Sequence, residues 1–233
     1  MKNKFIVIEG VDGSGKATQT KLLVENLKKD GFSADSISFP AYGEGSCRFV
    51  ENFLNGVYGH PSEINGYLGS SFYILDRFEQ SPKIKQKTKD NDFLISDRYS
   101  TANFVHRGTQ FLEKGDLEGL NKFFDWVYDF EFDKAGLPQP DLIIFLSLSM
   151  ENIRKLINKK IQDNRQYVTV DGGLDLAEQD VKHQESSLKI GKEFLPKYFK
   201  NYVVLECENE AGEILSIEEI NKKLIILIKD FIK

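Results

Sequence analysis

The chain has 233 residues, of which 40% are hydrophobic and 29% are charged, and its formal net charge is −5. This length suits one domain that spans residues 1–233 and buries a substantial core, and the acidic balance argues against a nucleic-acid-binding surface. No apolar run approaches the roughly 20 residues that a membrane-spanning helix needs. Its two cysteines, Cys47 and Cys207, lie far apart in the sequence and not in a metal-type spacing. We therefore expect a cytoplasmic protein without a membrane or nucleic-acid partner.

Strand-like and helical patterns alternate along the chain. The expected strands are short runs at 5–9, 34–39, 93–97, 141–148 and 202–206. The expected helices cover 16–30, 67–89, 101–111, 117–134, 150–162, 179–199 and 217–232, and Ser216 with Glu219 forms a capping-box pattern before the last one. The runs at 93–95 and 142–146 are apolar throughout, which is typical of parallel strands covered on both faces. These patterns predict an α/β fold with a central parallel five-stranded sheet and helices on both faces.

The segment between the first expected strand and the first expected helix is rich in glycine. Gly10, Gly13 and Gly15 let the backbone turn tightly and approach a ligand closely, and Lys16 adds a positive charge at the start of the helix. A strand, a glycine loop, a lysine and a helix in this order are the context of the phosphate-binding loop (P-loop) of nucleotide-binding proteins. A glycine-rich hairpin with a solvated lysine is the alternative. We expect ATP to contact Gly10, Asp12, Gly13, Ser14, Gly15, Lys16, Ala17 and Thr18.

One position departs from this motif. The motif has Ser or Thr directly after the lysine to hold Mg²⁺, and here that residue is Ala17. Either Thr18, about 100° further round the helix, partly substitutes, or the ion relies on water and a carboxylate elsewhere. Asp97 is the candidate carboxylate, because it follows an expected strand at the sheet edge where ligands bind. Arg98 next to it can reach a phosphate with its fork of donors, although a surface ion pair is the alternative for both residues.

The combination of the loop at 9–16 with Asp97-Arg98-Tyr99 resembles the thymidylate kinases. Other pieces fall in the order of that family over most of the chain, namely Phe39-Pro40-Ala41-Tyr42-Gly43, Leu75-Asp76-Arg77, Pro140-Asp141 and the acidic stretch 175–180. The resemblance implies a P-loop kinase fold and transfer of the γ-phosphoryl of ATP to dTMP with Mg²⁺. It also implies a homodimer that uses the helices around 52–77.

The resemblance further implies a thymine pocket. Tyr73 and Arg77 are four residues apart and share a helix face, where the family places an aromatic ring to stack on the base and an arginine to donate to a base carbonyl. Ordinary core packing is the alternative for Tyr73. Asn103 offers a donor and an acceptor to the base edge. Phe39 and Pro40 would form the pocket floor, and Tyr42 would crowd the position of a ribose 2′-hydroxyl. Asp12 would bind the sugar 3′-hydroxyl or tune the charge of the site, and Arg98 would hold the monophosphate.

A basic run precedes a glycine-containing stretch between about 154 and 175. A solvated helix end explains most runs of this kind. In a P-loop kinase the same run is expected to form a small mobile lid, and the loop at 11–14 has no basic residue of its own. We expect Lys160 and Arg165 to supply charge to the transferring phosphoryl group. The expected catalytic set is therefore Asp12, Lys16, Arg98, Lys160 and Arg165.

Two other functions remain open from the sequence. The first is a kinase for another nucleoside or nucleotide, because the P-loop recurs across that superfamily. The second is a non-catalytic nucleotide-binding protein, which Ala17 suggests. His106 stands near a position where many relatives have Tyr, and we leave it out of the catalytic set because the monophosphate oxygen that accepts the phosphoryl group is already ionised near neutral pH.

Overall fold

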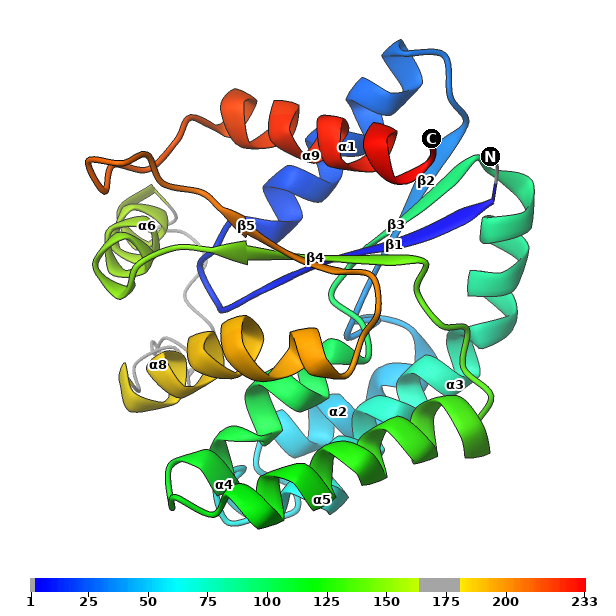
Figure 1. The fold of residues 1–233 in the computed structure, drawn as a ribbon. Coiled ribbons are helices and arrows are strands. Elements are labelled where there is room, and N and C mark those ends of the chain that lie inside the picture. Colours follow the sequence, from blue (N-terminus) through cyan, green and yellow to red (C-terminus); the bar gives the residue numbers. More distant parts are fainter. Residues whose placement is uncertain (1–2, 164–180) are drawn as a thin grey trace.

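Five parallel strands form the centre of the computed structural model, which describes residues 3–163 and 181–233. The sheet has the order β2-β3-β1-β4-β5 (Figure 1). Its strands are β1 (Lys4–Gly10), β2 (Ala34–Ser38), β3 (Phe93–Asp97), β4 (Leu142–Ser147) and β5 (Tyr202–Glu206). The central strand β1 pairs with β3 on one side and with β4 on the other, all in parallel. The expectation of a parallel five-stranded sheet is confirmed.

Helices cover both faces of this sheet, as expected (Figure 1). One face carries α1 (Lys16–Lys29) and α9 (Ile217–Phe231). The opposite face carries more helices, among them α2 (Arg48–Leu54), α3 (Gly66–Asp90), α4 (Thr109–Leu112), α5 (Leu117–Tyr128) and α8 (Val181–Lys189). Helix α6 (Met150–Asp163) follows β4 beyond the carboxyl edge of the sheet. Among the described residues, no helix is both long enough and apolar enough to cross a membrane.

The two faces of β1 belong to two apolar clusters because successive side chains of a strand point in opposite directions. Ile6 and Ile8 belong to the cluster that contains Leu23 of α1. Phe5 and Val7 belong to the other cluster, with Phe39, Tyr99 and Phe132. Burial of both faces accounts for the continuous apolar runs of β3 and β4.

Three helical stretches that the sequence pattern predicts as continuous contain π-helical turns instead. These turns are Asn103–Arg107, Asp129–Lys134 and Ile190–Phe194, and a short 3₁₀ turn, Leu195–Lys197, follows the last. A π-helical turn holds one additional residue and is frequent at functional sites. The 3₁₀ turn Gly45–Cys47 and α2 were not expected, since this part of the chain is too short for a clear helical period. The predicted capping box is confirmed: Ser216 Oγ accepts from Glu219 N at 3.2 Å, and Ser216 N donates to Glu219 Oε2 at 2.8 Å.

Candidate functional site

The glycine loop joins β1 to α1 in the strand–loop–helix arrangement that the sequence predicts. Gly13 and Gly15 have φ angles of 82° and 86°, a left-handed conformation that glycine adopts without steric cost. Lys16 is buried and extends back over the loop, where its Nζ donates to the carbonyl oxygens of Gly10 at 2.9 Å and Val11 at 2.8 Å. A positive charge is thereby held beside the free backbone N–H groups at the start of α1, which favours phosphate binding.

The loop also packs directly against α6. A Cβ atom added to Gly13 would lie 2.6 Å from Cγ1 of Ile157, which is closer than real Cβ contacts come. Gly13 is therefore required by packing as well as by its φ angle.

The ends of three neighbouring strands meet at this edge of the sheet. Asp97 is paired with Ile8 in the register of β3 and β1, and Arg98 N donates to Ile8 O at 3.0 Å. From the other side, Phe39 N donates to Asp97 O at 3.0 Å. The structure thus brings the glycine loop, the Phe39-Pro40 segment and the Asp97-Arg98 pair together at the carboxyl edge, where ligands bind in open parallel sheets.

Charged side chains at this edge lie within reach of one another. The Arg98 guanidinium forms an ion pair with the Asp12 carboxylate, and Arg98 itself has a φ of 64°. Burial acts to raise the pKa of Asp12, but the Arg98 charge and hydrogen bond, together with other nearby positive charge such as Lys16, outweigh it and hold that pKa well below its usual range. For Lys16 burial dominates and lowers the pKa to about 8. Asp12 and Arg98 are therefore charged at neutral pH, and the charge of Lys16 is sensitive to mildly alkaline pH.

Two buried oxygens at the same edge lack a protein partner. Asp97 Oδ1 and Ser14 Oγ have no hydrogen-bond partner among the described residues, and burial raises the pKa of Asp97. Oxygen donors of this kind are the ligands that Mg²⁺ prefers, together with water and phosphate. The described part of the chain contains no group of three or more His, Cys, Asp or Glu that could hold a metal without such additional ligands. Thr18, which is predicted to substitute partly for the missing hydroxyl at Ala17, is exposed in the first turn of α1, as is Ala17.

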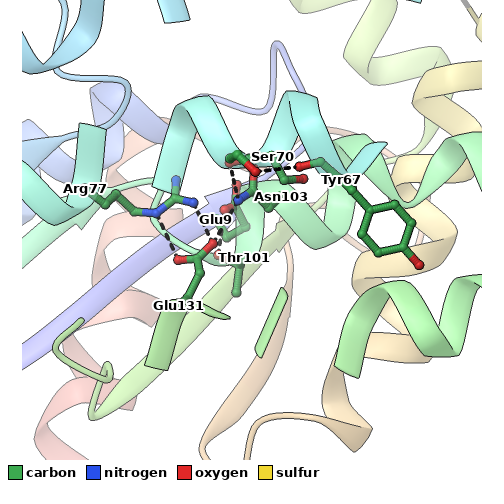
Figure 2. A network of polar contacts seen from close by, with 8 residues as sticks. Glu9, Tyr67, Ser70, Arg77, Thr101, Asn103 and Glu131 are labelled. Carbon is green, nitrogen blue, oxygen red and sulfur yellow. Dashed lines mark hydrogen bonds and ion pairs between the residues drawn. The ribbon is translucent and has the colours of Figure 1, made fainter. Parts of the chain in front are cut away.

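Arg77 lies in a cluster of polar side chains below α3 (Figure 2). It is buried, and Glu131 accepts two hydrogen bonds from it, at 3.0 Å from Nε and at 2.6 Å from Nη2. Asn103 Nδ2 donates to the same carboxylate at 2.8 Å. We call Arg77, Asn103 and Glu131 the Arg77 cluster. The sequence pointed to Arg77 and Asn103 but not to Glu131, which stands in an acidic stretch that resembles an ordinary solvated helix end.

A second set of contacts links the Arg77 cluster to the glycine loop. Thr101, two residues before Asn103, donates through Oγ1 to Glu9 Oε2 at 2.7 Å, and Glu9 Oε1 accepts from Gly10 N at 3.0 Å. Both Glu9 and Thr101 are buried. The Thr101–Glu9 hydrogen bond therefore holds the chain just before Asn103 against the start of the glycine loop.

The other predicted substrate residues lie around the Arg77 cluster. Phe39 is buried and Pro40 is partly buried. The Tyr99 ring lies between Phe39 and the cluster, with its centre 5.6 Å from that of the Phe39 ring and 5.9 Å from Arg77 Cζ. Tyr73 is half-buried with its ring edge-on to Phe53 at 6.2 Å. Tyr42 is 61% exposed. The role of Asp76, which sequence reasoning missed, is to hold the segment after Pro40: it accepts from Ala41 N at 2.9 Å and from Ser46 Oγ at 2.6 Å.

His106 is a further group near the charged edge. Its ring lies 5.8 Å from the ring of His183 in α8, and its Nε2 has no hydrogen-bond partner among the described residues. Burial lowers the pKa of His106 to about 3, so the ring is neutral at physiological pH.

Of the predicted lid at 154–175, Arg165 lies outside the described residues. Lys160 falls within α6, but its side chain also lies outside them.

A family model described as thymidylate kinase matches residues 8–169, which include the glycine loop, Arg98 and the Arg77 cluster. The chain belongs to the thymidylate kinase family. It is 29% identical over 154 residues to the protein named thymidylate kinase of Homo sapiens, a match that covers 66% of this chain and 65% of the human protein, just under two thirds. It is 28% identical over 236 residues to the probable thymidylate kinase of Thermococcus onnurineus, covering 97% of both chains.

The fold agrees with this membership. The solved structure of the thymidylate kinase from Candida albicans matches with a TM-score of 0.69 and 22% identity, and the match covers 98% of this chain and 92% of that one. At this identity the likeness shows the fold, which is the P-loop kinase fold expected for the thymidylate kinase family.

Proposed function

We propose that the protein is an ATP-dependent dTMP kinase, which transfers the γ-phosphoryl group of ATP to dTMP and forms ADP and dTDP. The observation that carries this proposal is the placement of the glycine loop with its buried Lys16 near the Arg77 cluster, where Thr101, two residues before Asn103, donates to Glu9 beside the loop at 2.7 Å. A protein that only bound a nucleotide would have no use for a buried arginine and amide beside its phosphate loop.

The donor nucleotide would lie on the loop from Gly13 to Thr18. The backbone N–H groups and Lys16 would bind its phosphates, and the low-dielectric setting strengthens these contacts. Asp97 and Ser14 fit the ligand set of a Mg²⁺ ion bound to those phosphates, and Thr18 is the further candidate. Such an ion neutralises charge that develops on the transferring group.

The acceptor would lie between the loop and the Arg77 cluster. Arg98 would bind the monophosphate, and its ion pair with Asp12 holds the guanidinium at the position needed. The nucleobase would meet Arg77 and Asn103, with Tyr73 stacked on it, Phe39 and Pro40 below it, and Tyr42 beside the sugar. Because the acceptor oxygen belongs to an ionised phosphate, the reaction needs positioning and charge rather than a general base. Lys160 and Arg165 would bring the remaining positive charge from the predicted lid.

We also propose that two copies pair through the surface formed by residues 49–78. Large apolar side chains stand exposed there on α2, on α3 and on the segment between them: Phe49, Leu54, Val57, Tyr58, Leu68, Leu75 and Phe78. A concentration of this kind marks a protein–protein contact.

We place the enzyme in the cytoplasm, where its buried Cys47 and Cys207 would remain thiols; cell fractionation tests this.

The function is tested by coupled measurement of ADP release with ATP and Mg²⁺, with dTMP, dUMP, dCMP, dGMP and dAMP compared as acceptors. Preferential turnover of dTMP is the expected result. Faster turnover of a purine monophosphate would keep a kinase but overturn the acceptor assignment. Binding of ATP without turnover of any acceptor would overturn the kinase itself.

A further inference from the structure

One carboxylate holds both polar groups that the proposed acceptor would meet. Glu131 is fully buried, and its Oε1 accepts from Arg77 Nη2 at 2.6 Å and also from Asn103 Nδ2 at 2.8 Å. Its other oxygen accepts from Arg77 Nε at 3.0 Å. Figure 2 shows Glu131 between the two side chains. A bidentate pair with arginine fixes orientation as well as charge.

These contacts decide which way the Asn103 amide points. Besides Glu131, its Nδ2 donates to the backbone carbonyl oxygen of Ser70 at 3.4 Å. A carboxylate and a carbonyl can only accept hydrogen bonds, so the nitrogen of the amide must face both of them. The oxygen Oδ1 is consequently directed away, and no donor from the described residues bonds to it. Asn103 therefore presents an acceptor.

Arg77, in contrast, presents hydrogen-bond donors. Glu131 uses the hydrogen of Nε and one hydrogen of Nη2, which leaves the second hydrogen of Nη2 and both hydrogens of Nη1, and a guanidinium can only donate. The Arg77 cluster thus offers one donor and one acceptor in a fixed arrangement. The face of a pyrimidine that fits has an oxygen at C4 and a hydrogen on N3, as in thymine and uracil. Cytosine has the reverse, with an amino group at C4 and an unprotonated N3.

We propose that Glu131 is a positioning residue that makes the acceptor site select 4-oxo over 4-amino pyrimidines, by fixing Asn103 with its oxygen outward and Arg77 with its donors outward. This inference rests on the proposed function and deepens it. Neither Arg77 nor Asn103 alone specifies the base, because an unconstrained asparagine amide can rotate to offer either group. A cytosine in the fixed site would leave buried groups unpaired, and this is what excludes it.

The comparison of dUMP with dCMP tests the proposal, because the two differ only in the groups at C4 and N3. For the wild-type enzyme we expect kcat/KM to favour dUMP by roughly 100-fold or more. In Glu131→Gln an NH2 group replaces one carboxylate oxygen, so a single acceptor oxygen is left for the two Arg77 donors and Asn103, and the Asn103 amide is held less firmly. The ratio should then fall by roughly tenfold or more, with most of the change in KM. Asp129→Asn is the matched control: this carboxylate lies in the same π-helical turn as Glu131 but pairs with Lys134, and the ratio should stay within about twofold of wild type.

Each outcome decides between the proposals. A folded Glu131→Gln enzyme with an unchanged ratio and equal losses for both acceptors overturns the positioning role, because a merely structural residue would behave in that way. If Glu131→Gln does not unfold cooperatively, Glu131→Asp replaces it. The shorter aspartate keeps the negative charge opposite Arg77 but withdraws the oxygen from Asn103, so the ratio of kcat/KM for dUMP to that for dCMP must fall in this variant too. Absence of wild-type turnover with every acceptor overturns the proposed function instead. In that case the affinities of the same proteins for dUMP and dCMP, measured by calorimetry, still give the ratio of preference between the two bases.

Discussion

Asp76 and Ala41 are 35 residues apart in the sequence, and the Asp76 carboxylate accepts a hydrogen bond of 2.9 Å from the Ala41 backbone N–H. Through this bond and the one from Ser46 Oγ, α3 holds the segment that follows Phe39-Pro40. The Asp76 carboxylate therefore helps to fix the helix that carries Arg77 relative to the segment that carries Phe39, and Gln80 of the same helix also bonds Ser46 at 3.0 Å.

Removal of this carboxylate should destabilise the protein measurably. In Asp76→Ala the Ala41 N–H and the Ser46 hydroxyl lose their partner in a buried setting, and the expected loss is about 2–4 kcal/mol in the free energy of unfolding. Urea unfolding followed by circular dichroism measures it. Glu79→Ala, at an exposed position of the same helix, should change stability by less than about 0.5 kcal/mol. Equal effects of the two substitutions would contradict the anchoring role.

ATP binding should weaken as the pH rises through about 8. Burial lowers the pKa of Lys16 to this value, so its positive charge is present below pH 8 and is lost above it in the free enzyme. Titration of a fluorescent ATP analogue between pH 6.5 and 9.5 reports the affinity. The variant Lys16→Met should lack this pH step and lose about 100-fold or more in kcat. Lys21→Met, at an exposed site on the same helix, should retain both the step and the activity.

The Mg²⁺ requirement should depend on Asp97. Its Oδ1 is buried and has no hydrogen-bond partner in the described part of the chain, as expected of a ligand to an ion. We expect Asp97→Asn to raise the Mg²⁺ concentration that gives half-maximal activity by about tenfold. Asp35→Asn removes a carboxylate of β2 that pairs with Lys87 instead, and serves as control. The comparison of Thr18→Ala with Ala17→Thr then shows whether Thr18 contributes to Mg²⁺ binding. If it does, Thr18→Ala raises the Mg²⁺ concentration that gives half-maximal activity.

The proposed dimer should separate when a charge enters its surface. Phe78 is 52% exposed on α3, and Phe78→Glu would place a carboxylate among the apolar side chains of the 49–78 surface. Sedimentation at micromolar concentration should show a dimer for the wild type and a monomer for the variant. Ile226→Glu on α9, where Ile226 is 58% exposed, is the matched control and should remain dimeric. A monomeric wild type would remove the dimer from the proposal.

His106 should make the protein sensitive to acid. Burial keeps its pKa at about 3 in the folded state, whereas an unfolded histidine titrates near 6.5. The unfolded chain therefore binds more protons between these values, and stability falls as the pH is lowered through that window. From pH 7 to pH 5 the contribution amounts to at most about 2 kcal/mol. His106→Gln should lose less stability over this range than the wild type does, as urea unfolding at both pH values will show. Equal losses would mean that His106 is charged in the folded protein.

The sequence was sufficient for the sheet and for the strand–loop–helix arrangement around Lys16, because both depend on local patterns. The apolar runs of β3 and β4 and the spacing of the glycines before Lys16 follow from short stretches of residues. The roles of Glu131 and Asp76 could not be read in this way. Glu131 meets Arg77 from a different helix, 54 positions away, and nothing in its own neighbourhood distinguishes it from Asp129 or Asp133. The π-helical turns were hidden for a similar reason, since a 3.6-residue period continues on either side of them.

The contact between Gly13 and Ile157 has a mechanical consequence. Gly13 of the phosphate loop packs so closely on Ile157 of α6 that a Cβ atom would not fit between them, so a displacement of the loop at Gly13 toward α6 is transmitted to this helix. A loop that shifts when phosphates bind would push on α6 directly, without deforming the sheet beneath it. The helix that leads toward residues 164–180 is therefore positioned to respond to whether the loop holds a nucleotide.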